Sequence, residues 1–238
     1  MRRIFALVLI FVLLLLSVQA FGQISRKNQI EIYAGAGFPI KPDAFKDFYK
    51  MGMSLNAQYV IFPSARLGIP IFAGYERFTV DDQAISDLFG QGLIGGYIPD
   101  NSGYYWEITD ASLESSGSAS LIKIGAGIRP YLTAPEASTQ IFLFGNASYN
   151  FLKTKSEVKS ASLDVQEYYT GTTGTIKLTA ADFEKYEESE NRFGAGVGAG
   201  LEVPVGSSFN MIFQGMYNMI FTKEESTSFV GVTAGVVF

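Results

Sequence analysis

Apolar and polar residues alternate with a period of two along most of the chain, which is the pattern of a β-strand with one apolar face. In the clearest run, apolar side chains alternate with glycines that lie between Arg192 and Glu202. Pro70, in the third run, fits least, because proline has no N–H to donate to a neighbouring strand. Eight such runs are found, at residues 29–38, 51–62, 66–76, 122–129, 141–151, 192–203, 209–222 and 229–238. The sequence therefore predicts an all-β protein.

The connections between these runs alternate in length. Residues 63–65, 132–139 and 204–208 form short joins, whereas 39–50, 79–117 and 153–190 form long ones; the brief join 223–228 fits this alternation less well. The runs have about the 9 to 11 residues that a tilted strand needs to cross a membrane. We therefore predict an eight-stranded antiparallel transmembrane β-barrel with short periplasmic turns and long external loops.

Period-two alternation alone does not say which face points inward, so a soluble ligand-binding barrel is the alternative. Glycines crowd the polar face, where a narrow lumen has little room for large side chains. Aromatic residues also end the apolar faces, as interface girdles require. These aromatic residues are Phe38, Tyr75, Phe151, Phe193, Phe209 and Phe221. Both features favour the membrane barrel.

The first residues have the layout of a secretory signal peptide. A basic start, Met1-Arg2-Arg3, precedes an apolar run from Ile4 to Leu16 that is shorter than the roughly 20 residues of a membrane-spanning helix. We predict a signal peptide at residues 1–22, cleaved after Ala20 or Gly22, with an uncleaved anchor as the alternative. Residues 23–238 would then form an exported barrel domain.

The last strand ends on an aromatic residue, and aliphatic side chains occupy the alternate positions before it: Val230, Val232, Ala234, Val236 and Phe238. With its eight runs, the mature chain resembles the small eight-stranded outer-membrane barrels of the OmpA and OmpX type. The resemblance implies location in the bacterial outer membrane, contact with its lipid, and a C-terminal signal read by the barrel-assembly machinery. The tyrosine common near the end of that signal is missing, and the resemblance implies no ligand.

Charged residues on the polar faces predict a lumen plugged by two ionic layers. Laying the strands alternately up and down from a periplasmic start places Glu31, Arg66, Arg129 and Glu202 near the periplasmic end and Glu76, Lys123 and Arg192 toward the outside. Each group mixes signs, and unpaired charge is strongly disfavoured in a narrow, poorly hydrated interior. The alternative is that some of these residues lie at the rims in water.

Several kinds of chemistry are disfavoured by the composition. The chain has no Cys and no His, and its net charge is -5, which argues against disulfides, thiolate sites, histidine catalysis and nucleic-acid binding. Gly194 to Ala199 matches a dinucleotide fingerprint, but its glycines recur as one face of a strand. Asn146-Ala-Ser148 matches a glycosylation acceptor inside a strand, which we attribute to chance. We predict a non-enzymatic protein without catalytic, cofactor or metal sites.

Function is then expected in the long external loops at 79–117 and 153–190, where an external partner could bind. The first loop contains no Lys or Arg, and its acids could bind divalent cations or form a solvated surface; they are Asp81, Asp82, Asp87, Asp100, Glu107, Asp110 and Glu114. Its aromatic residues could anchor a partner or pack on the rim; they are Tyr97, Tyr104, Tyr105 and Trp106. Because eight strands leave a narrow interior, we favour a structural or surface-interaction role over a porin-like conduit for small solutes.

Overall fold

The structure is a computed structural model that describes residues 26–99, 105–205, 209–223 and 225–238. The predicted signal peptide, residues 1–22, lies outside the described residues and stays a prediction. Within the described ranges, no helix is long and apolar enough to cross a membrane.

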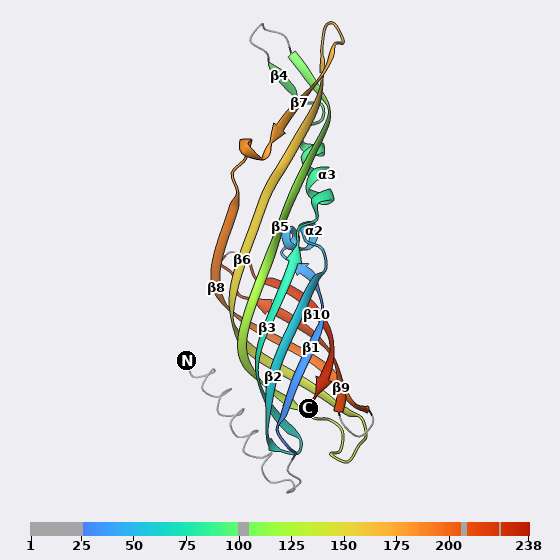
Figure 1. Ribbon diagram of the computed structural model, residues 1–238, viewed down its shortest axis with the longest axis vertical. Coiled ribbons are helices and arrows are strands. Elements are labelled where there is room, and N and C mark those ends of the chain that lie inside the picture. The colour runs from blue at the N-terminus through green and yellow to red at the C-terminus, as the bar shows by residue number, and fades with distance from the viewer. Residues whose placement is uncertain (1–25, 100–104, 206–208, 224) are drawn as a thin grey trace, which may run out of the picture.

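Eight long strands of the described chain close into an antiparallel barrel (Figure 1). Each of these strands pairs with the barrel strands that come before and after it in the sequence, as β5 does with β6. The first strand, β1, pairs with the last, β10, and this closes the ring. The ring leaves no barrel strand with an open edge at the membrane level, as a spanning sheet requires. The strands are β1 (Gln29–Lys41), β2 (Gly52–Ser64), β3 (Leu67–Thr79), β5 (Tyr105–Pro130), β6 (Gln140–Glu167), β8 (Tyr186–Val205), β9 (Phe209–Ile220) and β10 (Thr227–Val237). The predicted fold class is confirmed.

The barrel turns its apolar faces outward and its polar faces inward. Leu55 and Ile124 are 58% and 49% exposed, whereas Glu31 in the lumen is 0% exposed. A soluble barrel would show the opposite arrangement, so this is the architecture of a barrel that spans a membrane. The six aromatic residues predicted to end the apolar faces are all exposed.

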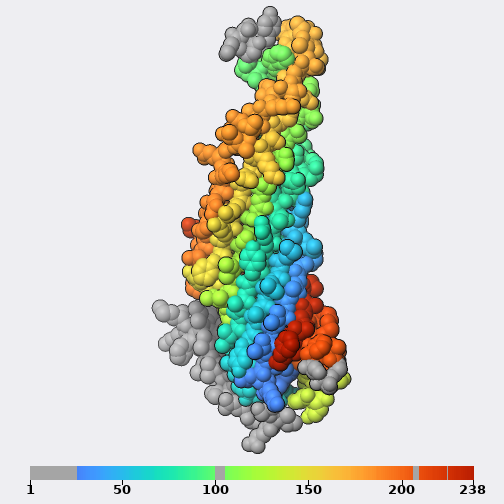
Figure 2. Space-filling view, viewed as in Figure 1, coloured from blue at the N-terminus to red at the C-terminus, as the bar shows by residue number. Residues whose placement is uncertain are grey.

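On the external side, part of the sheet continues well beyond the barrel (Figure 1). Here β4 (Tyr97–Pro99) pairs with β5, and β7 (Thr173–Thr179) pairs with β6. The unit also contains α3 (Asp82–Leu93) and η1 (Ala180–Asp182). We call this unit, with the outer parts of β5, β6 and β8, the extension. Figure 2 shows it as a narrow column above the wider barrel.

Much of the chain predicted to form external loops is therefore regular structure, which the alternating pattern did not indicate. Apolar alternation does continue there, but it is diluted by serine, threonine and acidic residues. Ile108, Ala111 and Val165 form a buried cluster of their own, against which Phe89 and Leu93 of α3 pack. This small core gives the extension a stable shape.

The external mouth of the barrel is covered by α2 (Asp43–Phe48), within the predicted loop 39–50. Phe45 and Tyr49 pack against a buried cluster of Phe78, Leu121, Ile220 and Phe229. The Phe45 and Phe78 ring centroids are 4.9 Å apart, and those of Phe78 and Phe229 are 5.3 Å apart. Aromatic side chains thus close the lumen from outside.

Candidate functional site

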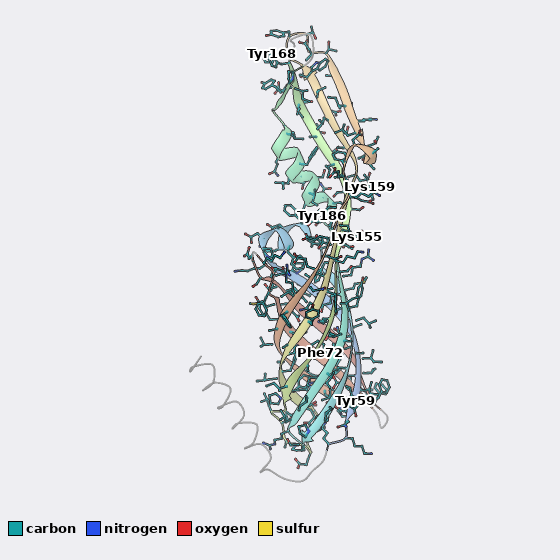
Figure 3. The ribbon with its side chains drawn as sticks, turned by 90° about the vertical axis from the view of Figure 1, so that its left-hand side faces the viewer. Tyr59, Phe72, Lys155, Lys159, Tyr168 and Tyr186 are labelled. Atoms are coloured by element: carbon teal, nitrogen blue, oxygen red, sulfur yellow. The ribbon has the colours of Figure 1, made fainter. Side chains whose placement is uncertain are left out.

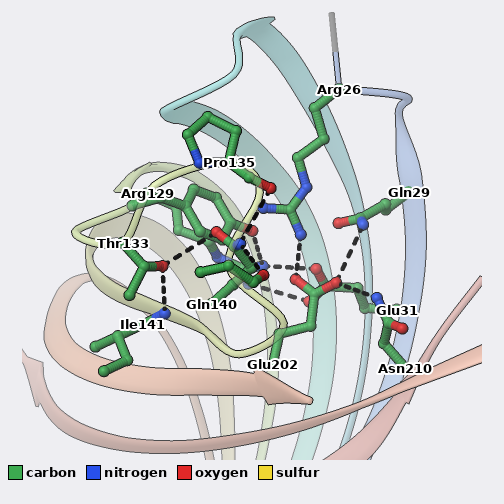
Figure 4. A network of polar contacts seen from close by, with 12 residues as sticks. Arg26, Gln29, Glu31, Arg129, Thr133, Pro135, Gln140, Ile141, Glu202 and Asn210 are labelled. Atoms are coloured by element: carbon green, nitrogen blue, oxygen red, sulfur yellow. Dashed lines mark hydrogen bonds and ion pairs between the residues drawn. The ribbon is translucent and has the colours of Figure 1, made fainter. Parts of the chain in front are cut away.

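The lumen contains a buried ion pair near its periplasmic end (Figure 4). Arg129 reaches Glu31 with two parallel bonds, from Nη1 to Oε1 at 2.6 Å and from Nη2 to Oε2 at 3.0 Å. The two side chains are 1% and 0% exposed. Gln58 also donates to Glu31 and accepts from the Tyr33 hydroxyl at 3.2 Å. Such a bidentate, fully hydrogen-bonded geometry is what a buried carboxylate needs.

A second carboxylate at the same end, Glu202, pairs with a residue that was not predicted to lie in the lumen. Arg26, just before β1, forms an ion pair with Glu202, and Asn210 donates to the same carboxylate at 2.6 Å. The Arg26 guanidinium also lies over the Tyr131 ring, 4.2 Å from its centroid. Because Arg26 precedes the first alternating run, no periodicity marked it as a residue of the lumen.

A third ion pair lies farther toward the outside, on β3 and β5. Lys123 Nζ is 2.5 Å from Glu76 Oε1, and both side chains are 4% exposed. The register places these residues near each other because Gly74 of β3 is opposite Lys123 and Glu76 is opposite Leu121. The structure therefore brings Glu76 and Lys123 together at a second level of the lumen.

Two of the charged residues assigned to the lumen lie elsewhere. Arg66 is exposed in the tight turn between β2 and β3, where its carbonyl accepts from the Tyr131 N–H at 2.9 Å, so its assignment to an ionic layer is wrong. Arg192 is partly exposed at the external rim and pairs with Glu190 at 2.7 Å, rather than with Glu76. The rim position was the alternative considered for such residues.

Apolar layers fill the lumen around these charges. Val60, Phe142, Ile212 and Val237 form the periplasmic cluster with Phe62 and Tyr131. The glycines of β8 make room for it: a Cβ at Gly200 would lie 2.4 Å from the Phe142 ring. Between this cluster and the mouth, a cavity beside Lys123 measures about 10 Å³. That is close to the least space that holds one water molecule.

Exposed tyrosines gather at the far end of the extension. Tyr97, Tyr105, Tyr168 and Tyr169 are 55%, 51%, 62% and 70% exposed. The Tyr97 and Tyr168 ring centroids are 6.3 Å apart. Figure 3 places Tyr168 at this end, far from Tyr59 and Phe72 in the barrel. We call Tyr97, Tyr105, Tyr168 and Tyr169 the tip. Trp106, predicted with the tyrosines, instead packs beside the core of the extension, and Tyr104 lies outside the described residues.

The acidic residues of segment 79–117 are spread out. Asp81 accepts from the Ala84 N–H at the start of α3, and Lys50 lies 3.1 Å from Asp82. The hydrogen bond and charge of Lys50 lower the pKa of the Asp82 carboxyl. Glu114 pairs with Lys159 at 3.6 Å, and Asp100 lies outside the described residues. Among the residues that the structure describes, no group of three or more acidic side chains is placed to hold a metal ion.

The residues that resemble an assembly signal share the outer face of β10. Val232 and Phe238 are 53% and 67% exposed, and the Phe238 N–H donates to the Ile30 carbonyl at 2.9 Å. This pairing places Phe238 at the periplasmic end of the barrel, beside the start of β1. Its exposed ring points away from the lumen.

No protein-family model matches the sequence, and a search of curated proteins found no match. Among solved structures, the chain is similar to Neisserial surface protein A (14% identity, 88% of this chain and 95% of that chain covered, TM-score 0.45). It is also similar to Ail, the attachment invasion locus protein of Yersinia pestis (13% identity, 90% and 100% covered, TM-score 0.45). A third similar structure is a major outer membrane protein from Thermus thermophilus (11% identity, 90% and 99% covered, TM-score 0.46). The likeness is in fold only. The fold itself is assigned as an eight-stranded barrel from the strand pairing of this chain.

Proposed function

We propose that this protein is a non-enzymatic barrel of the bacterial outer membrane that presents the extension to a partner outside the cell. The observation that carries the proposal is the extension itself, because closing a barrel does not require it. It has its own buried cluster, its own helix and an end with exposed tyrosine rings. Tyrosine is enriched where proteins bind partners, because it offers a large apolar face and a polar hydroxyl at low entropic cost.

The tip is the part of the extension that we expect to contact the partner. Cells that express the protein should adhere to immobilised matrix proteins or glycans. Replacing both Tyr97 and Tyr168 with serine should reduce adhesion to the preferred surface by roughly tenfold, because two aromatic contacts are lost. Tyr186→Ser is the matched control, because Tyr186 is 53% exposed but lies on β8 away from the tip. If the tip variant and the control adhere equally to every surface that the unmodified protein binds, the tip is not the binding site.

The filled lumen supports this role over the narrow conduit for small solutes. Ionic and apolar layers alternate from the periplasmic cluster to the aromatic side chains under α2. We therefore expect the unmodified protein to show little steady conductance in planar lipid bilayers. A large and steady conductance would overturn the plug and make the conduit the better proposal.

We also propose that Phe238 acts mainly in assembly. Its ring is exposed, so deleting it removes little buried apolar area, although two backbone hydrogen bonds with Ile30 are lost. Deletion should therefore lower the amount of barrel in outer-membrane fractions by several-fold, while protein refolded in detergent unfolds at a similar urea concentration. Normal amounts of the truncated protein in the outer membrane would show that the resemblance to an assembly signal is misleading.

A further inference from the structure

Two adjoining cavities lie at the external mouth of the barrel, far from the tip. The inner cavity measures about 110 Å³ and lies beneath α2. The outer cavity, which we call the recess, measures about 890 Å³ and lies between α2, β6, β8 and the β9–β10 connection. Leu152, Thr154 and Thr227 line both spaces, so the two cavities adjoin at these side chains.

The inner cavity is apolar. Its walls are mainly the aromatic and aliphatic side chains that close the mouth: Phe45, Phe78, Leu121, Ile220 and Phe229. An apolar cavity of about 150 Å³ lined by similar side chains stays dry and binds benzene. The inner cavity is somewhat smaller, so its volume suits one aromatic ring or a short hydrocarbon chain.

The recess is acidic where it meets the inner cavity. Strand register places Glu190 directly opposite Leu152, and Glu188 directly opposite Thr154. Directly opposed residues have their Cβ atoms about 4.5–5.5 Å apart, so both glutamates arise beside the junction of the two cavities, and both line the recess. Among the described residues that line the recess, Glu225 adds a third carboxylate and Lys223 is the one cation.

Glu188 is a carboxylate at the junction of the two cavities that has no cationic partner in the part of the chain that the structure describes. Glu190 is paired with Arg192 at 2.7 Å, whereas Glu188 accepts a hydrogen bond from the neutral Tyr186 hydroxyl. The ion pairs formed by the described residues of β8 involve Glu187, Glu190, Arg192 and Glu202, and none includes Glu188. A cationic group in the recess would therefore be attracted to it, and an anionic group would be repelled.

We propose that the mouth binds a small cationic amphiphile, with one ring or short hydrocarbon chain under α2 and an ammonium group beside Glu188. The apolar end gains by leaving water, and the amine gains by reaching a carboxylate that lacks a cation. This site goes beyond the proposed role of the extension. It uses the mouth, shares no residue with the tip, and takes a small molecule.

The proposal is tested with full-length protein refolded in lipid nanodiscs and with 2-phenylethylamine as the probe. Binding should shift the methyl NMR signals of Leu121 and Ile220. Two matched compounds isolate each half of the ligand: 3-phenylpropanoate keeps the ring but carries a negative charge, and n-butylamine keeps the amine but lacks the ring. Each should bind roughly tenfold more weakly or worse. Equal binding of the anion, or shifts confined to lipid-facing residues such as Ile124, would overturn the proposal.

Variants then place the two ends of the probe. Glu188→Gln should weaken binding of 2-phenylethylamine by roughly threefold to tenfold and reduce its advantage over the anion. Glu187→Gln is the matched control, because Glu187 is adjacent on β8 but pairs with Lys153 at 2.5 Å and Lys155 at 3.0 Å. Both residues are exposed, so the fold should survive either change.

Ala119→Leu should fill the inner cavity and abolish the shifts at Ile220, since Ala119 lines that space. Unchanged affinity in both Glu188→Gln and Ala119→Leu would show that the probe binds elsewhere. Neither result bears on adhesion through the tip, so the two proposals fail separately.

Discussion

Replacing Arg129 with alanine should destabilise the barrel by about 3–5 kcal/mol, because the change leaves a buried carboxylate without its cation. Glu31 is 0% exposed and receives two bonds from Arg129, at 2.6 and 3.0 Å. Gln58 still donates to Glu31 in the variant, but a neutral amide does not replace a guanidinium. The measurement is the free energy of unfolding by urea in lipid vesicles.

Arg66→Ala is the matched control for this experiment. Arg66 is an arginine of the same barrel end, but it lies exposed in the β2–β3 turn. Its removal should change the free energy of unfolding by no more than about 0.5 kcal/mol. Equal effects of the two substitutions would contradict the buried pair described here.

A double variant distinguishes two causes of the instability, the unpaired charge of Glu31 and the loss of packing around Arg129. If charge imbalance causes the instability of Arg129→Ala, then replacing Arg129 with methionine and Glu31 with leucine together should restore much of the lost stability, because paired apolar replacements of a buried ion pair are often neutral. A double variant less stable than Arg129→Ala would indicate that the surrounding hydrogen bonds matter more than the charge.

Replacing Ile124 with lysine should cost about 2–4 kcal/mol if the barrel spans a bilayer. Ile124 is 49% exposed on the outer face of β5, between Ala73 of β3 and Tyr149 of β6. In water, replacing such an exposed side chain with lysine would change the free energy of unfolding very little. In the middle of a bilayer, its ammonium must leave water or distort the lipid to stay hydrated.

The control for Ile124→Lys is Leu88→Lys in α3. Leu88 is 57% exposed, close to the value for Ile124, but α3 belongs to the extension rather than the barrel wall. We expect a change of less than about 0.5 kcal/mol for Leu88→Lys. Since the two sites differ mainly in the medium outside them, equal effects would argue that Ile124 does not face lipid.

The sequence by itself determined the barrel strands and their faces. Alternation is a local property, because successive side chains of a strand point to opposite sides whatever the strand pairs with. This is why all eight strands, their outward aromatic ends and the inward positions of Glu31, Arg129 and Glu202 could be predicted. The direction of the apolar face followed less directly, from glycines and aromatic residues, and the exposed outer surface confirms it.

The tertiary structure alone decided which charges meet and what lies outside the membrane. Which charges pair depends on strand register. Shifting one strand by any even number of residues keeps the same side chains on the same face, so the period-two pattern does not choose among these registers. Arg26 pairs with Glu202 although it precedes the first strand. Arg66 lies in a tight turn and is exposed, so it is not part of the lumen. The extension and the position of α2 over the mouth depend on contacts between distant segments, such as Phe45 with Phe78 and Phe89 with the cluster around Ile108. Contacts of this kind form only once the strands are in register, so no local pattern marks them.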